Sequence, residues 1–181
     1  MFGMELLNCA KLATADALGN TANLARQELR MRIVDRFLGR FKATQRNDSV
    51  FGPMRYMGDR MGYWESKISF APTRSAIELF VDGSADNDMG LQHKFFDQLL
   101  QEWSAVSEAT GKMLWQKWRD QESNTRAESP WEVFNLSSVS IPTASIEDAK
   151  WEISFATLAA PHQLWTLQME GRKPRQLTVD D

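Results

Sequence analysis

The sequence predicts an α+β domain: an antiparallel sheet of about six strands, with two helices inserted after the third strand and covering one face. In several short segments apolar residues recur at every second position, as in half-buried strands. In other segments they recur every third or fourth position, as in amphipathic helices. The strand-like segments come in consecutive groups and do not alternate one by one with helices, which favours an antiparallel sheet.

A helical N-terminal part is expected to precede the sheet. Segment 24–41 has apolar residues at helical spacing and arginines on its other side, and a weaker helical pattern covers 5–18. Residues 26–46 carry seven basic and two acidic side chains, whereas 47–181 carry 13 basic and 20 acidic ones. We therefore divide the chain into an N-terminal helical extension, residues 1–46, and an α+β domain, residues 47–181.

The first group of strands is expected at 50–57, 63–70 and 76–81, as an antiparallel meander. In the second strand, alternation puts Trp64 on one face and Glu65 on the other. The polar stretch 44–49, which precedes these strands, is assigned to neither a helix nor a strand.

Two helices are expected next. Apolar residues at helical spacing run from Leu91 to Val106, with Asp88 as the N-cap and Gly111 as the end. A second helix covers about 112–122. The last group of strands is expected at 133–141, 151–157, 165–169 and 176–179.

Composition restricts the compartment and the partners. With Cys9 as the single cysteine no intrachain disulfide can form, which is typical of a reducing compartment. The first twenty residues lack the pattern of a secretion signal, and no apolar run reaches the ~20 residues that a membrane span needs. We expect a cytoplasmic protein without membrane contact. Nucleic-acid binding is not expected, because the basic segment and the aromatic-rich strands are separate in the sequence.

No cofactor is expected. The sequence contains neither a glycine-rich phosphate-binding motif nor a G-x-S-x-G motif, and two histidines with one cysteine make a catalytic zinc site improbable. The best candidate for a metal is the acidic loop that contains Asp82, Asp86 and Asp88. Its spacing follows a calcium loop, but Asn87 stands where that loop needs glycine, and His93 where it needs glutamate. Stabilisation of a helix N-terminus explains these acids better.

Carboxylates on one sheet face are a second candidate for chemistry. Alternation places Glu65 on the same face as Glu78 or Asp82. These carboxylates are either a pair for acid–base catalysis or ordinary solvent-exposed side chains of a strand. His93 precedes Asp97 by four residues, so we expect these two to pair along one helix side.

Aromatic residues supply the candidate binding residues. Trp115 and Trp118 are one turn apart on a short helix, where they either pack in the core or anchor a partner protein. Tyr63, Trp64 and Glu65, which open a strand, are the other candidates.

Several short motifs carry a family resemblance. They are Val50–Met54 (VFGPM), Tyr63–Glu65 (YWE), Trp151–Phe155 (WEISF), His162 and Val179–Asp180. In this order they resemble a bacterial domain family of unknown function, over roughly residues 50–181. Several members of that family are encoded near polymorphic toxins and are interpreted as immunity proteins. The resemblance implies a protein partner and supplies no catalytic residues.

Three functions stay open at this point. The first is a non-enzymatic interaction protein, such as an immunity-type inhibitor whose acidic domain binds a basic toxin. The second is a structural subunit that forms a homodimer through residues 24–41. The third is a small hydrolase that uses a metal or carboxylates, with these candidate residues: Glu65, Asp82, Asp86, Asp88 and His93.

Overall fold

The computed structural model describes residues 44–58, 62–86, 88–121 and 126–180. The chain divides between residues 42 and 43 into two units, and the described residues belong to the second unit. The helices expected at 5–18 and 24–41, together with Cys9, lie outside the described residues. No helical extension is therefore shown.

Eight strands form one sheet, and their order in the sheet is their order in the sequence. Each strand pairs antiparallel with the next, except that β4 and β5 run parallel. The strands are β1 (Gln45–Asp48), β2 (Gly52–Tyr56), β3 (Tyr63–Phe70), β4 (Ser75–Asp82), β5 (Phe134–Ile141), β6 (Lys150–Thr157), β7 (Leu164–Glu170) and β8 (Lys173–Asp180).

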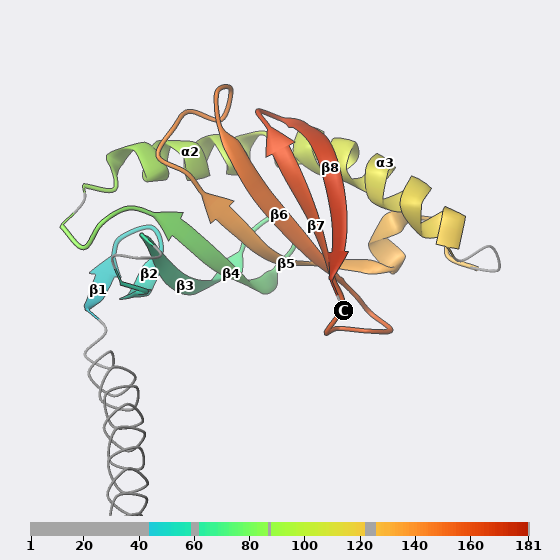
Figure 1. Ribbon diagram of the computed structural model, residues 1–181, viewed down its shortest axis with the longest axis horizontal. Coiled ribbons are helices and arrows are strands. Elements are labelled where there is room, and N and C mark those ends of the chain that lie inside the picture. The colour runs from blue at the N-terminus through green and yellow to red at the C-terminus, as the bar shows by residue number, and fades with distance from the viewer. Residues whose placement is uncertain (1–43, 59–61, 87, 122–125, 181) are drawn as a thin grey trace, which may run out of the picture. The chain divides into compact units, whose positions relative to one another are not determined.

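Two helices connect β4 to β5 and lie on one side of the sheet (Figure 1). They are α2 (Gly90–Gln101) and α3 (Trp103–Gln121), and a short 3-10 helix, η2 (Pro130–Glu132), follows them. A parallel strand pair needs a long crossover connection, and the two helices supply it. The helical connection therefore makes the parallel pairing of β4 with β5 possible.

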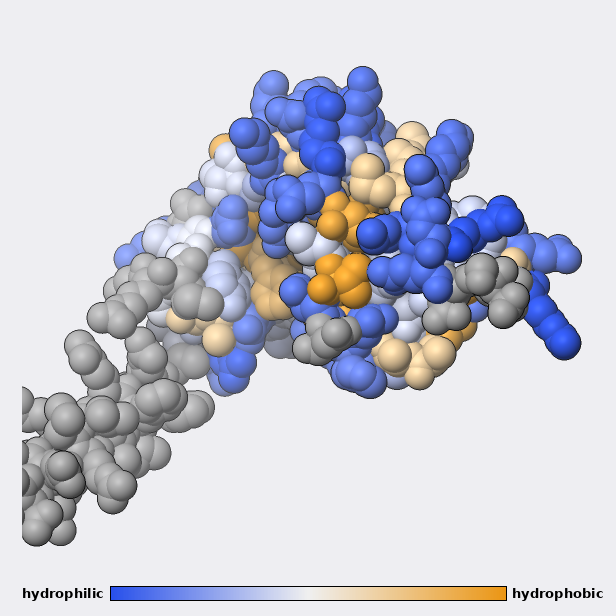
Figure 2. Space-filling view, turned by 45° about the vertical axis from the view of Figure 1, so that its right-hand side comes forward, coloured by the Kyte–Doolittle hydropathy of each residue, from blue (hydrophilic) through white to orange (hydrophobic). Residues whose placement is uncertain are grey.

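The hydrophobic core lies between the helices and the sheet. Helix α2 buries Phe95 and Leu99 against the side chains that the strands direct to the same side. Edge-to-face aromatic contacts join the layers, with ring centroids 4.9 Å apart for Phe70 and Trp103 and 5.4 Å apart for Phe95 and Trp151. Seen from the side that carries β8, hydrophilic side chains cover most of the surface, with hydrophobic groups between them (Figure 2).

The α+β class is right, but the expected sheet is wrong in two respects. It has eight strands and not six, and it is mixed because β4 and β5 are parallel. All seven segments expected as strands are present, and the strand missing from them is β1, in the polar stretch 44–49. The two helices therefore follow the fourth strand and not the third. The segment expected as one strand from residue 50 begins with a turn, in which the Asp48 carboxylate accepts the backbone N–H of Val50 and Phe51.

The expected helix boundaries are also wrong. The helices are separated at Glu102, and Gly111 lies in the middle of α3 and does not end a helix. Packing favours glycine there, because a Cβ atom at this position would stand 2.9 Å from Cζ2 of Trp131. The N-cap of α2 is Met89, which makes no side-chain capping bond, so Asp88 is not the cap.

Candidate functional site

The sheet has a second face, which points away from α2 and α3. Because successive side chains of a strand point to opposite sides, every strand that buries one set of residues presents the other set on this face. Within the described ranges, both helices lie on the core side, and no helix or strand covers the second side (Figure 1). We call this second side the open face.

Strand register aligns the open-face side chains in two rows across the sheet. One row, the charged row, consists of Gln45, Arg55, Glu65, Phe80, Ser140, Glu152, Gln168 and Gln176. The other, the hydroxyl row, consists of Lys67, Glu78, Ser138, Ser154, Thr166 and Thr178. Both rows are almost entirely polar, and Phe80 is the large apolar side chain among them.

An aromatic pair stands at the β3–β4 end of this face. The rings of Tyr63 and Phe80 meet edge to face, with centroids 5.7 Å apart and planes at 90°. Beside them, Nη2 of Arg55 lies 2.7 Å from Oε2 of Glu65. Partial burial, together with the charge of Glu65, raises the pKa of the Tyr63 hydroxyl. The pair thus combines partly exposed apolar area with charged neighbours.

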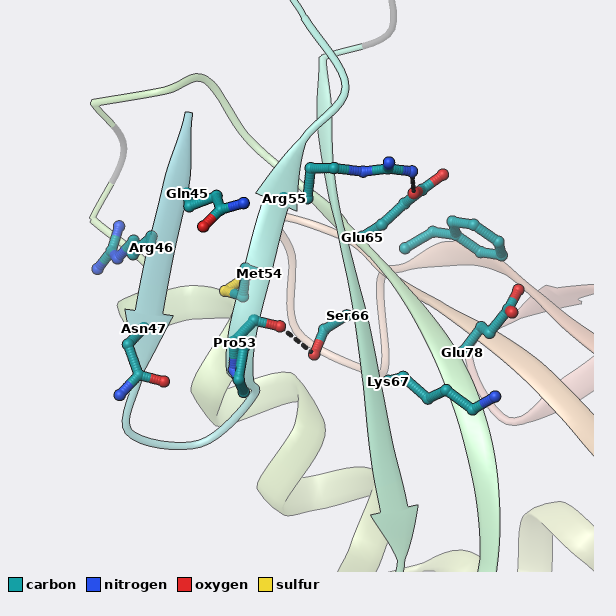
Figure 3. Close-up of a pocket in the computed structure, with 11 residues that line it drawn as sticks. Gln45, Arg46, Asn47, Pro53, Met54, Arg55, Glu65, Ser66, Lys67 and Glu78 are labelled. Carbon is teal, nitrogen blue, oxygen red and sulfur yellow. Dashed lines mark hydrogen bonds and ion pairs between the residues drawn. The ribbon is translucent and has the colours of Figure 1, made fainter. Parts of the chain in front are cut away.

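The described residues of this face line at least two hollows. The larger, of about 870 Å³, lies over β1 to β4 and has Arg55, Glu65, Lys67, Glu78 and Phe80 in its lining (Figure 3). The smaller, of about 420 Å³, lies over β5 to β8. The two hollows lie on the same side of the same sheet, so a partner with an extended contact surface can fill both.

Small hydroxyl residues occupy part of the open face on β5 to β8. Ser138 and Ser154 are each only 8% exposed although no described helix lies above them. The Ser154 and Thr166 hydroxyls lie 3.0 Å apart and bond to each other.

Of the predicted binding residues, Tyr63 and Glu65 lie on the open face, and Trp64 does not. Trp64 is completely buried on the core side, where its Nε1–H donates to the carbonyl oxygen of Ser84 at 3.2 Å. It is a structural residue, and a partner cannot reach it without unfolding the strand.

Trp115 and Trp118 lie on α3, on the other side of the sheet from Tyr63. Trp118 packs against the core, with its ring centroid 5.7 Å from that of Phe134 and 5.9 Å from that of Trp165. Trp115 is partly exposed, and the Arg119 guanidinium lies 6.0 Å from its ring centroid. The structure thus does not join these tryptophans to the Tyr63 site.

The acidic loop does not form a metal centre with its surroundings. Among the described residues, no group of three or more His, Cys, Asp or Glu side chains could hold a metal ion, so Asp82, Asp86 and Asp88 are not brought together. Neighbouring protein atoms partly desolvate the Asp82 carboxyl and raise its pKa, although the residue remains exposed. The pairing of His93 with Asp97 is wrong, because His93 bonds to Asp48 instead.

Most residues of the open face were not predicted from the sequence. Arg55 and Phe80 were not singled out, nor were the hydroxyl residues of β5 to β8. A signal for Phe80 was present, because in the third expected strand it alternates with Ile77, Leu79 and Val81, which share the other face. The Ser and Thr residues of the open face also alternate with apolar residues in the sequence. Only the register of the folded sheet shows that they align across the strands.

The comparisons with known proteins give no relative. No protein-family model, no curated protein and no solved structure matches the chain. Within the described ranges, none of the helices has both the length and the apolar character needed to span a membrane.

Proposed function

We propose that this chain is an interaction protein that binds a partner protein on its open face, in the cytoplasm, as an inhibitor of the immunity type. The observation that carries the proposal is the Tyr63–Phe80 pair with its charged surroundings. Protein interfaces commonly have an aromatic centre that supplies most of the binding energy and a polar rim that fixes orientation. The open face offers this combination next to a hollow of about 870 Å³.

Charge supports a basic partner. Residues 47–181 carry 20 acidic and 13 basic side chains, so a cationic protein approaches the domain with a favourable long-range attraction. At the site itself the charges are mixed, because Arg46, Arg55 and Lys67 line the larger hollow together with Glu65 and Glu78, so the attraction comes from the domain as a whole. Long-range attraction of this kind accelerates association and weakens as salt is added.

The experiment compares baits that differ in one side chain. Full-length protein, the Phe80→Ala variant and the Gln116→Ala variant are immobilised and exposed to a lysate of the native host in low salt and in about 0.5 M salt. Gln116 is exposed on α3, on the far side of the sheet, so it is the matched control. We expect the wild type and the control to retain the same protein, and Phe80→Ala to lose at least ~30-fold of the binding, as for a loss of about 2 kcal/mol at a hot spot.

Two results would contradict the proposal. One is that no protein is retained at either salt concentration. The other is that Phe80→Ala and Gln116→Ala retain the same proteins in equal amounts, because the partner would then bind elsewhere on the molecule. Inhibition is tested separately, by adding the pure chain to the isolated partner and measuring the partner's activity.

A further inference from the structure

The two edges of the sheet differ in length. β1 has four residues, whereas β8 has eight. An edge strand presents unpaired backbone N–H and C=O groups, and a long one is a template for pairing with another strand. A short edge such as β1 offers few of these groups. The β8 edge is therefore the place where the described sheet can be extended.

The features that usually block such pairing are confined to the first half of β8. The strand begins with two charged residues and a proline, Lys173, Pro174 and Arg175. Next to them, the register with β7 is irregular between Gln168 and Met169 of β7. Charges, proline and irregular register all protect edges. The residues that follow, 176–179, contain neither a charge nor a proline. The second half of β8 is thus free of these protective features.

This unprotected half also has apolar side chains at the rim of the core. Leu177 and Val179 pack against the core but remain partly exposed, as expected for a layer that ends at this strand. An added strand would cover the exposed part of both side chains and pair the free backbone groups beside them.

We propose that β8 pairs antiparallel with β8 of a second copy of this chain, centred on Thr178. Residues that face each other in an antiparallel pair have their side chains on the same side of the sheet. A pair centred on Thr178 meets this condition, because it matches core-side residues with core-side residues and open-face residues with open-face residues. It places Leu177 opposite Val179 of the second copy on the core side. On the open face it places Gln176 opposite Asp180 of the second copy. The two sheets become one continuous sheet with a twofold axis at Thr178.

Charge is the reason for choosing a second copy as the occupant. β8 is positive at its start, with Lys173 and Arg175, and negative at its end, with Asp180. In the register centred on Thr178, antiparallel pairing brings Arg175, the neighbour of Gln176, close to Asp180 of the second copy, whereas Lys173 lies beyond the residues that pair. Arg175 already holds Glu170, with Nε 2.7 Å from Oε2, but its guanidinium has further N–H donors for Asp180 of the second copy. The interaction is independent of the homodimer expected through residues 24–41.

A site-specific crosslink tests this register in the full-length chain. In a Cys9→Ser background, Thr178→Cys places two thiols opposite each other across the twofold axis, within the range that a disulfide spans. Gln176→Cys is the matched control, on the same face of the same strand. In the proposed register residue 176 faces Asp180 of the second copy, so the two cysteines of this variant lie four residues apart along the strand pair and are too far apart to form a disulfide. We expect mild oxidation to convert most of the Thr178→Cys protein, and under a tenth of the control, to a covalent dimer.

A second measurement uses the unmodified protein. Hydrogen exchange at backbone amides 176–180 is expected to slow at least tenfold between dilute and concentrated samples, as the mass from light scattering doubles. A monomer at all concentrations would overturn the proposal, and so would a dimer whose β8 amides exchange at the same rate as in the monomer. Equal crosslinking of both cysteine variants would overturn the register. These readouts involve neither Phe80 nor a partner protein, so they fail or succeed separately from the proposed function.

Discussion

The Nε2 atom of His93 lies 2.9 Å from Oδ1 of Asp48, which joins helix α2 to the turn between β1 and β2. The same oxygen accepts the backbone N–H of Val50 at 2.8 Å and that of Phe51 at 3.1 Å. The Asp48 side chain is only 3% exposed. One carboxylate thus fixes both the turn and its distance from the helix, and it holds β1 at the rim of the larger hollow.

The first prediction concerns this carboxylate. Burial alone would raise the pKa of Asp48, but hydrogen bonds from Phe51, Val50 and His93 together lower it below its ordinary value of 3.8. A carboxyl group whose pKa is lower in the folded state than in the unfolded state stabilises the fold. This stabilisation is fully present above the pKa of the unfolded state and is lost as the pH falls through the pKa of the folded state. We expect Asp48→Asn to lower the free energy of unfolding by about 1–3 kcal/mol at about pH 7. In urea titrations, the difference from the wild type should shrink at about pH 3.

Asp97→Asn is the control for this experiment. Asp97 is exposed on the same helix, four residues after His93, where the sequence alone predicts the partner. We expect its removal to change the free energy of unfolding by less than about 0.5 kcal/mol. A loss as large as that of Asp48→Asn would show that His93 pairs along the helix, contrary to the structure.

The second prediction concerns the junction of the two helices. Arg172, in the turn between β7 and β8, binds both carboxylate oxygens of Glu102, and its Nη2 also lies 2.9 Å from Oε1 of Glu147. The hydrogen bonds from Arg172 lower the pKa of Glu102. A bidentate ion pair between segments that are distant in the sequence fixes the position of both segments. A single exposed ion pair within one helix adds little to the stability of the fold.

We therefore expect Glu102→Gln to lower the melting temperature by several degrees. The control is Glu108→Gln, which removes an exposed pair with Lys112 within α3 and should leave the melting temperature unchanged. Differential scanning calorimetry of the three proteins under one buffer condition measures both effects. If the two substitutions behave alike, Glu102 contributes no more than an ordinary surface pair.

The third prediction concerns Gly111. A Cβ atom there would stand 2.9 Å from Trp131 Cζ2 and 3.3 Å from Pro130 Cγ, both on η2. Alanine in place of glycine favours a helix by about 1 kcal/mol, but crowding of this kind costs about 1–3 kcal/mol. We expect Gly111→Ala to destabilise the wild type slightly. In a Trp131→Ala background, where the ring is gone, the same substitution should be stabilising.

A double-mutant cycle by urea unfolding measures this change of sign. If Gly111→Ala has the same effect in both backgrounds, Trp131 does not pack on Gly111 in solution.

The fold could be predicted wherever alternation was strong. The strands around Trp64 and Trp151 were confirmed in position and in face, because large apolar residues at every second position are compatible with one face only. β1 could not be found this way, since its residues 45–48 are all polar and pair through their backbone. The parallel pairing of β4 with β5 also escaped the sequence, because it depends on where the two helices lead the chain.

The candidate site was predicted only in part, because it depends on how the strands pair and on which face of the sheet the helices cover. Tyr63 and Glu65 were named, but the sequence does not show which face a helix will cover, so Trp64 was named with them. Phe80 was missed, because in the sequence it is one apolar residue among several. Only cross-strand register brings it beside Glu65 and opposite Ser140.

The last prediction separates the core face from the open face within one strand pair. Trp64 is 0% exposed, and its neighbours across the core include Tyr56, whose ring centroid is 5.1 Å away. We expect Trp64→Leu to lower the free energy of unfolding by about 2–4 kcal/mol, because it leaves a cavity and an unpaired Ser84 carbonyl. Phe80 is only partly buried, on the opposite face, so Phe80→Ala should cost about 1 kcal/mol. Urea unfolding followed by circular dichroism measures both. Equal losses would mean that Phe80 is as deeply covered as Trp64 in solution, and a face that is already covered has no room for a partner protein.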